Sequence, residues 1–271
     1  MINIHRSIFA LLNVVNELYR KEIETFRITK TSSLLLMAGV DKNSISDNII
    51  KKCVNEQKED GGWVGVTDTI WNTKFLKLID EAKYDINIKN ALAWLKNQQL
   101  TDKLWGRSYR DMSRIPVTGV LLYLLPELAS DESLNALEKL WAKECNSITY
   151  KAAYTLMAFK KNNYSPTNTS LILNTINWLK EQQKNDGGFT PWKKHPIESQ
   201  VFCTAIALLG LIQFPEMVET NVFKNGMNWL IKNQLPTGMW AYHQIEDGCS
   251  WGLFALKSLV EYEEKNIINI S

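Results

Sequence analysis

The sequence lacks any run of about 18 consecutive apolar residues, the length that a helix needs to cross a membrane. It also lacks a dominant charge, because 31 basic and 29 acidic residues leave a net charge of +2. This balance gives no electrostatic basis for binding nucleic acid. No stretch alternates apolar and polar residues with a period of two, so no β-sheet is expected. These absences predict a helical protein with no membrane span and no nucleic-acid partner.

Cysteine and histidine are too few and too scattered to form a recognisable metal or redox motif. The four cysteines include no C-x-x-C pair, and each lies in or beside an apolar run, where it is expected to be a small buried side chain. Such thiols suit a reducing compartment, and a cytoplasmic location is expected. The amphipathic stretch 1–23 has no small-residue cleavage site, so it predicts a first helix rather than a signal peptide.

One segment recurs along the chain and carries the prediction of the fold. In every copy a glutamine precedes the final aromatic residue by six positions. Such internal repeats indicate an architecture built from stacked supersecondary units. The copies are KCVNEQKEDGGW (52–63), WLKNQQLTDKLW (94–105), WLKEQQKNDGGF (178–189) and WLIKNQLPTGMW (229–240).

The spacing of the copies predicts the number of units. The second and third copies are separated by twice the distance between the first two, so a degenerate repeat is expected near residue 136, where Trp141 lacks a following Gly-Gly turn. Residues before 52 supply one more pair of helices. We therefore expect a single all-α domain over 1–271, an α/α toroid of about six helical hairpins.

Each unit has a simple physical interpretation. An amphipathic helix ends at a turn such as Asp60-Gly61-Gly62, because glycine tolerates a positive φ and aspartate favours turns. A more apolar helix follows, and a helix that is apolar on most sides is buried on most sides. Outer one-sided helices and inner two-sided helices then alternate, and the inner helices begin around a central mouth.

These repeats resemble the QW motifs of squalene-hopene and oxidosqualene cyclases and the repeats of protein prenyltransferase β subunits. The resemblance covers roughly residues 50–265 and is best in NEQKEDGGW and KEQQKNDGGF. It implies an apolar cavity for an isoprenoid, and it allows peripheral membrane contact. Triterpene cyclases normally carry two such domains, and this chain has the length of one.

The resemblance also implies where a catalytic acid would lie. The cyclases place it in a D-x-D-D-T-A or V-x-D-C-T segment at the start of an inner helix, and neither segment occurs here. The nearest stretch is 65–70, in which Asp68 aligns with the last aspartate of the motif and Thr67 takes the place of the proton donor. Asp68 is therefore a relocated acid or an N-cap of the helix that follows it.

Two further carboxyl groups are candidates for catalysis. Asp247 lies near His243 in the corresponding loop of the last repeat, and the alternative is a polar loop with a helix cap. Glu198 precedes an apolar helix that resembles the last zinc-site helix of prenyltransferase β subunits, with Cys203 where that family has a histidine. A metal site is nevertheless not expected, because the sequence shows no ligand spacing among His195, His243, Glu198 and Asp247.

Aromatic and basic residues near the inner-helix starts are candidates for binding a substrate. Aromatic faces stabilise carbocations, and ordinary core packing is the alternative. Arg114, with Arg107 and Arg110, is a candidate to hold a diphosphate or is part of a solvated loop. No cofactor is expected, apart from Mg²⁺ if the substrate is a diphosphate, although D-D-x-x-D is absent. The aromatic candidates are Trp71, Tyr109, Trp192, Tyr242 and Trp251, with His243 beside them.

Three functional hypotheses follow from the sequence. The resemblance favours an isoprenoid-handling enzyme, a class II-like terpene cyclase that acts by protonation with Asp68 or Asp247 as the acid. The missing donor motif favours a non-catalytic ring that binds a lipid or peptide or serves as a scaffold. A carbohydrate-active α/α barrel is the third, because it needs two carboxyl groups across the mouth, such as Asp68 with Glu198 or Asp247. The sequence does not specify the oligomeric state or a partner subunit.

Overall fold

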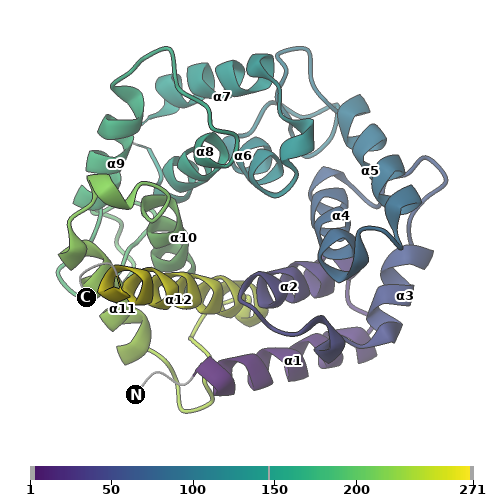
Figure 1. Ribbon diagram of the computed structural model, residues 1–271, viewed down its shortest axis with the longest axis horizontal. Coiled ribbons are helices and arrows are strands. Elements are labelled where there is room, and N and C mark those ends of the chain that lie inside the picture. The colour runs from purple at the N-terminus through teal and green to yellow at the C-terminus, as the bar shows by residue number, and fades with distance from the viewer. Residues whose placement is uncertain (1–3, 146, 269–271) are drawn as a thin grey trace.

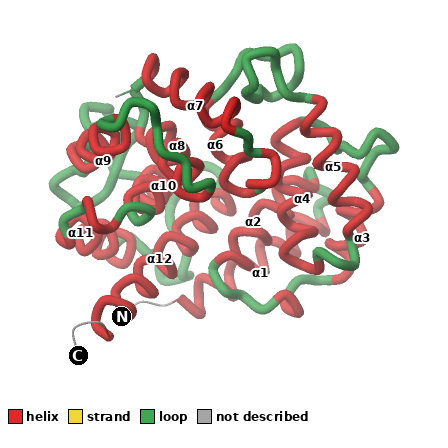
Figure 2. The backbone as a smooth tube through the Cα atoms, turned by 45° about the horizontal axis from the view of Figure 1, so that its top comes forward, coloured by secondary structure: helices red, strands yellow, loops and turns green. Residues whose placement is uncertain are grey.

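The computed structural model describes residues 4–145 and 147–268, and this part of the chain forms twelve α-helices and no strand (Figures 1 and 2). The helices make two concentric rings, as the sequence predicts. The outer ring contains α1 (Ile4–Arg20), α3 (Asp47–Asn55), α5 (Asp85–Asn97), α7 (Asp131–Glu144), α9 (Leu171–Glu181) and α11 (Thr220–Lys232). The inner ring contains α2 (Thr25–Met37), α4 (Val66–Asp80), α6 (Ile115–Leu124), α8 (Thr149–Lys161), α10 (Val201–Leu211) and α12 (Ile245–Ile268).

The composition of each helix explains the ring that it joins. In α10, VFCTAIALLGL, every residue except Phe202 is buried, because both faces of the helix pack against other helices. In α11 the buried residues repeat at helical spacing on one side, and the polar residues face solvent. The predicted alternation of one-sided outer helices and two-sided inner helices is confirmed. None of the helices in the described residues is long and apolar enough to span a membrane.

Two of the repeat glutamines, Gln57 and Gln183, connect their own turn to the outer helix of the next hairpin. The Nε2 group of Gln57 donates to the carbonyl of Gly61 in its own turn at 2.8 Å and to the carbonyl of Asn87, in α5, at 2.9 Å. Gln183 makes the same pair of hydrogen bonds, to Gly187 and to Val222 in α11, both at 2.9 Å. In each case one side-chain amide links the backbone of its own turn to the backbone of the next outer helix.

The aspartate of each Asp-Gly-Gly turn adds a second link to the next hairpin. Asp60 accepts from the backbone N–H of Gly62 at 3.0 Å and from the indole of Trp94, in α5, at 3.1 Å. Asp186 accepts in the same way from Gly188 and from Trp229, in α11. The repeat tryptophan therefore belongs to one hairpin and bonds to the turn of the hairpin before it.

In the three repeats that end in tryptophan, this residue ties the turn to both of its helices. The indole of Trp63 donates to the carbonyl of Cys53 at 2.9 Å, in the outer helix that precedes it. Its backbone N–H donates to the hydroxyl of Thr69 at 3.0 Å, in the first turn of the inner helix that follows. Trp105 makes the equivalent bonds, to Leu95 and Thr118. The glutamine side chain thus bonds to the turn, and the tryptophan indole, six residues later, bonds back to the outer helix that precedes the turn.

The ring closes through the last repeat and the first helix. Gln234 donates to the hydroxyl of Ser7, in α1, at 2.7 Å, and Ser7 donates to the carbonyl of Gly238 at 2.6 Å. Helix α1 therefore takes the position that the next outer helix takes in the other repeats, and Figure 1 shows α1 beside α11. The degenerate repeat is confirmed as α7 and α8, and its Trp141 donates to Thr175, in α9, at 2.8 Å.

Two positions differ from what the sequence suggests. Cys145 is exposed, so the expectation that all four cysteines are buried is wrong for this one, because it follows the end of α7 rather than lying within a helix face. In the second repeat Lys103 adopts a φ of 70°, the left-handed conformation that Gly61, Gly187 and Gly238 adopt in the other copies.

We expect Gln57→Ala to lower the free energy of unfolding by about 1–3 kcal/mol, because it leaves the carbonyls of Gly61 and Asn87 without their side-chain donor. Urea unfolding followed by circular dichroism measures the change. Gln98→Ala is the control, since Gln98 precedes the repeat glutamine Gln99 by one residue. Equal losses in the two variants would contradict the linking role of Gln57.

Replacement of Lys103, the residue with a positive φ in the second repeat, should raise the free energy of unfolding rather than lower it. We expect Lys103→Gly to raise the unfolding free energy by about 0.5–1 kcal/mol, because glycine adopts this φ without steric cost. Gly187→Ala is the matched opposite: at a φ of 90° its Cβ meets the carbonyl oxygen of Asn225 at 2.4 Å, so the variant is destabilised. Thermal unfolding of both proteins tests the pair, and stabilisation by Gly187→Ala would overturn this account of the turn.

Candidate functional site

The connections from outer to inner helices all lie at one end of the ring, so the first turns of the inner helices surround a common mouth (Figures 1 and 2). Asp68 is the third residue of α4, and Asp247 is the third residue of α12. Trp71 follows Asp68 by about one turn, and Trp251 follows Asp247 by about one turn. The mouth therefore contains two carboxyl groups, each with a tryptophan one turn deeper in the ring.

Asp68 does not cap its helix. The N-cap of α4 is Gly65, so the alternative in which Asp68 is the N-cap is wrong. The two residues before Asp68 already have helical backbone, because the helix starts earlier than the aspartate pattern suggests. Asp68 remains within the first turn, where a carboxylate interacts favourably with the helix dipole.

The environment of Asp68 favours its protonated form. Burial raises the pKa of this carboxyl; its own backbone N–H lowers it, the Glu24 carboxylate raises it further, and Lys58 lowers it slightly. The net direction is upward, because desolvation of the charged form is the largest effect. Within the described residues no cation lies close enough to Asp68 to form a salt bridge.

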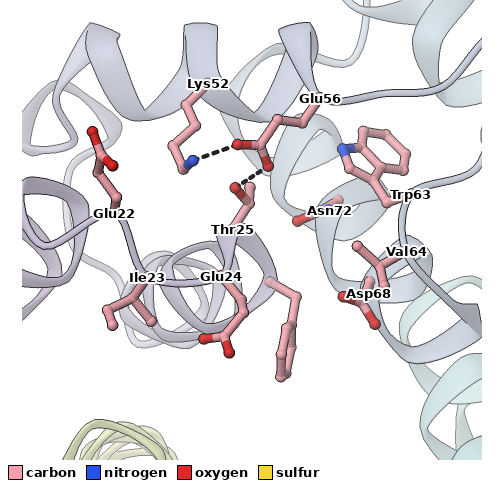
Figure 3. Close-up of a pocket in the computed structure, with 11 residues that line it drawn as sticks. Glu22, Ile23, Glu24, Thr25, Lys52, Glu56, Trp63, Val64, Asp68 and Asn72 are labelled. Carbon is pink, nitrogen blue, oxygen red and sulfur yellow. Dashed lines mark hydrogen bonds and ion pairs between the residues drawn. The ribbon is translucent and has the colours of Figure 1, made fainter.

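A pocket of about 330 Å³ lies beside Asp68, between the start of α2 and the start of α4 (Figure 3). Its apolar wall consists of Ile23, Phe26, Trp63 and Val64. Its polar wall includes Glu56, which accepts hydrogen bonds from Thr25 and Lys52. The polar lining is completed by Glu22, Glu24, Asp68 and Asn72.

Asp247 has a different environment, because a lysine neutralises it. The Lys30 Nζ atom lies 2.7 Å from the Asp247 Oδ1 atom, and both side chains are 20 % exposed. The preceding residue, Glu246, is 5 % exposed and accepts from Arg27 Nε at 2.8 Å. Arg27 and Lys30 lie one turn apart on α2, so this helix pairs with both carboxylates in the first turn of α12. Asp247 was expected in a loop, and it lies in the helix because α12 begins at Ile245.

Buried aromatic side chains form a layer below the two carboxyl groups. The Trp71 and Trp251 rings meet edge to face with centroids 5.9 Å apart, and Trp251 lies 6.2 Å from Tyr154 of α8. These three side chains are 2 %, 0 % and 6 % exposed. These aromatic side chains come from α4, α12 and α8, three different helices of the inner ring (Figure 1).

A second aromatic group lies nearer the rim. Tyr150 is 6.3 Å from Phe202, and Phe202 stacks on Tyr242 at 6.0 Å. Burial, and then the Asp247 carboxylate, raise the pKa of Tyr154 and of Tyr242. Both phenols therefore stay protonated and act as neutral aromatic groups with an O–H donor.

The structure brings together some of the predicted site residues and not others. Asp68, Trp71, Asp247, Trp251 and Tyr242 lie at the mouth or in the aromatic layer. The remaining predicted residues lie on exposed loops that precede α6, α10 and α12: Tyr109, Trp192, Glu198 and His243, while Arg114 is the N-cap of α6.

The contacts of these loop residues are local. Tyr109 is 59 % exposed and Trp192 is 41 % exposed, and Trp192 packs against His195. Arg114 holds Asp111 in a two-point ion pair at 2.6 and 2.9 Å, which places the pKa of Asp111 well below its usual range. A diphosphate at Arg114 would therefore compete with Asp111.

Sequence reasoning missed Lys30, Tyr150, Tyr154 and Phe202. Lys30 lies in the first hairpin, before the first recognisable repeat, and the tyrosines lie on the degenerate repeat. Their one signal is helical spacing, since Tyr150 and Tyr154 fall on the same face of α8.

No group of three or more metal-ligating side chains occurs in the part of the chain that the structure describes. The carboxylates of α12 are already paired with Arg27 and Lys30. The described side chains therefore provide no set of ligands that fits Mg²⁺.

Comparison with known proteins supports this architecture. Residues 140–264 match the squalene-hopene cyclase C-terminal domain family. The chain is 28% identical over 123 residues to protostadienol synthase A of Arthroderma gypseum, a match that covers 42% of this chain and 16% of that protein. It is 26% identical over 185 residues to lanosterol synthase of Pneumocystis carinii, covering 65% of this chain and 20% of that protein. The chain therefore spans a fifth or less of the length of these curated relatives.

Solved structures share the fold over nearly the whole chain. One is a variant of the type II terpene cyclase MstE from Scytonema in complex with its substrate, geranylgeranyl dihydroxybenzoate; it has 12% sequence identity and a TM-score of 0.75, covering 95% of this chain and 97% of that chain. A protein from Actinoplanes has 14% identity and a TM-score of 0.68, covering 87% and 90%. The two rings of helices, the repeat hydrogen bonds and these similarities identify the chain as a terpene cyclase-like α/α toroid.

Proposed function

We propose that this chain is an isoprenoid-handling enzyme, a class II-like terpene cyclase that starts cyclisation by protonating an alkene. The observation that carries the proposal is the position of Asp68. It is a half-buried carboxyl with a raised pKa, beside a pocket with an apolar wall, at the mouth of a terpene cyclase-like ring. A carboxyl whose pKa is raised by burial is the kind of group that such a reaction needs as its acid.

Asp68 suits the role of acid better than Asp247 does. Asp247 is engaged by the Lys30 ammonium at 2.7 Å, so donation of a proton from it would first require loss of that ion pair. Asp68 has no such partner among the described side chains. Glu198 lies on an exposed loop, where water screens it from an apolar substrate.

The reaction is an isomerisation whose atoms and electrons balance within the substrate and Asp68. The Asp68 carboxyl transfers its proton to one carbon of an alkene, and the π electrons form the new C–H bond. A second alkene attacks the resulting carbocation and closes a ring. Loss of a proton from a neighbouring carbon to the Asp68 carboxylate then forms a new alkene and restores the acid.

The substrate class follows from the pocket and from the relatives. An apolar wall of Phe26, Trp63 and Val64 suits a branched hydrocarbon, and about 330 Å³ lies at the small end of the range for ligand pockets, ~300–1,000 Å³. MstE is described with a geranylgeranyl-bearing substrate, which supports an isoprenoid chain as the ligand here.

A non-catalytic isoprenoid-binding ring is the second candidate. One observation favours it: Trp71, Trp251 and Tyr154, from three inner helices, are buried and pack against one another, where a cyclase needs room for its substrate. In this case the pocket beside Asp68 still binds an isoprenoid, and no product forms.

A product assay decides between the two candidates. We expect the purified protein to cyclise at least one of farnesyl diphosphate, geranylgeranyl diphosphate, squalene and oxidosqualene, tested with and without Mg²⁺. Asp68→Asn should reduce the rate by at least about 100-fold, because it removes the proton. Asp247→Asn is the matched control and should retain activity. Loss of product in Asp247→Asn alone would assign the acid to Asp247, and ligand binding without product would favour the binding ring.

The raised pKa of Asp68 has a consequence for stability that needs no substrate. Because this pKa is higher in the folded than in the unfolded state, folding binds a proton, and the carboxyl lowers stability as the pH rises from its unfolded pKa through its folded pKa. We therefore expect Asp68→Asn to be more stable than the wild type at neutral pH, and the difference to vanish towards about pH 4.

Urea unfolding at several pH values measures this difference. Asp47→Asn is the control, because Asp47 is an exposed first-turn residue of α3, where removal of the charge weakens a favourable interaction with the helix dipole. A gain of stability for Asp68→Asn that does not change with pH would contradict the raised pKa.

A further inference from the structure

Lys30 lies at the centre of the most heavily charged part of the mouth. Helix α2 runs between α4 and α12, and Lys30 contacts both neighbours (Figure 1). Its ammonium lies 2.7 Å from the Asp247 carboxylate and 5.5 Å from the centroid of the Trp71 ring. One side chain of this protein therefore supplies a cation between an anion and an aromatic face.

The surroundings of the Lys30 ammonium have the composition of a site for an organic cation. Such sites combine a carboxylate with the π faces of aromatic residues, and tryptophan is the most effective of these. Asp247 supplies the carboxylate, and Trp71 supplies the face. Trp251 and Tyr154 lie behind Trp71 in the buried layer and limit its contact with water, which strengthens both interactions.

The other carboxylates near Lys30 do not form an ion pair with it in the described structure. Glu246, the other carboxylate of the first turn of α12, is paired with Arg27. Glu24, which lies 3.7 Å from Arg27, is mostly exposed. The Lys30 ammonium is thus matched by Asp247, and together they occupy the polar face above the aromatic layer.

We propose that Lys30 is a specificity-determining residue, whose ammonium fills a cation site formed by Asp247 and the Trp71 ring and excludes other cations from it. The proposal rests on the proposed function in one respect: the relevant cation is the carbocation of an isoprenoid. Two positive charges at contact distance repel each other strongly in a partly buried site. A carbocation formed beside Asp68 is therefore kept away from the Trp71–Trp251 layer.

This exclusion predicts where positive charge is stabilised in the reaction. The aromatic groups in the wall of the pocket beside Asp68 are Phe26 and Trp63, and these remain available to the carbocation. Cyclisation is then confined to rings that form close to the acid. Removal of the Lys30 charge opens the Trp71 face and leaves Asp247 as an unpaired anion that attracts a cation.

Binding of a protonated amine tests the inference without turnover. The probe is N,N-dimethylfarnesylamine, which is cationic near neutral pH, and farnesol is the neutral probe of the same chain length. We expect Lys30→Met to bind the amine at least ~10-fold more tightly than the wild type does, because a repulsive charge is removed and an attractive one exposed. Affinity for farnesol should stay within about twofold. Quenching of tryptophan fluorescence, calibrated by calorimetry, measures both affinities.

Three further variants serve as controls for the loss of the Lys30 charge. Lys96→Met removes a lysine from the outer helix α5 and should leave both affinities unchanged. Lys30→Met combined with Asp247→Asn should lose part of the gain, because the exposed anion is removed. Lys30→Arg, which keeps the charge, should bind the amine no more tightly than the wild type. Circular dichroism and thermal unfolding verify that each variant is folded.

Several outcomes would overturn the inference. One is equal amine affinity for the wild type and a folded Lys30→Met, and another is no amine binding by Lys30→Met. An equal gain for farnesol would also overturn it, because the effect would then come from added space rather than charge. None of these outcomes depends on product formation, so the failure of this inference is distinguishable from failure of the proposed cyclase activity.

Discussion

The hydrogen bonds from the repeat side chains to backbone groups of the turns are the interactions on which the ring depends. The amides of Gln57 and Gln183 bond to their own turn and to the next outer helix, and the indoles of Trp94 and Trp229 bond back to the preceding turn. A hairpin alone cannot satisfy these groups, so it is completed by its neighbours. The same constraint applies at the ends of the chain, where Gln234 bonds to Ser7 of the first helix.

This construction explains why the candidate site lies at one end of the ring. The repeat turns join outer to inner helices on one side, so the first turns of the inner helices converge there. Asp68 and Asp247 occupy equivalent third positions of their helices, yet only Asp247 forms an ion pair, because Lys30 of α2 reaches Asp247 and not Asp68. Equivalent positions in a repeat protein thus acquire different roles through the neighbours they contact.

The sequence predicted most of the framework and about half of the mouth. The glutamine–aromatic spacing was sufficient for the hairpins, including the degenerate one, because a regular spacing reflects a regular hydrogen-bond pattern. Trp71, Tyr242 and Trp251 were found because they follow recognisable turns. Tyr154 and Lys30 were missed because their hairpins lack the repeat motif. The alternative in which Asp68 is an N-cap was wrong because α4 begins at Val66, and helix starts are poorly defined by composition.

The sequence by itself determined the helical class, the number of hairpins and the alternation of outer and inner helices, since all three follow from local periodicity and from turn residues that repeat along the chain. Tertiary structure alone decided which carboxyl group has a raised pKa and which is paired. That difference depends on burial of Asp68 and on the approach of Lys30 to Asp247, residues 217 positions apart in the chain. Charge states are set by what lies nearby in space, and the order of residues does not specify those distances.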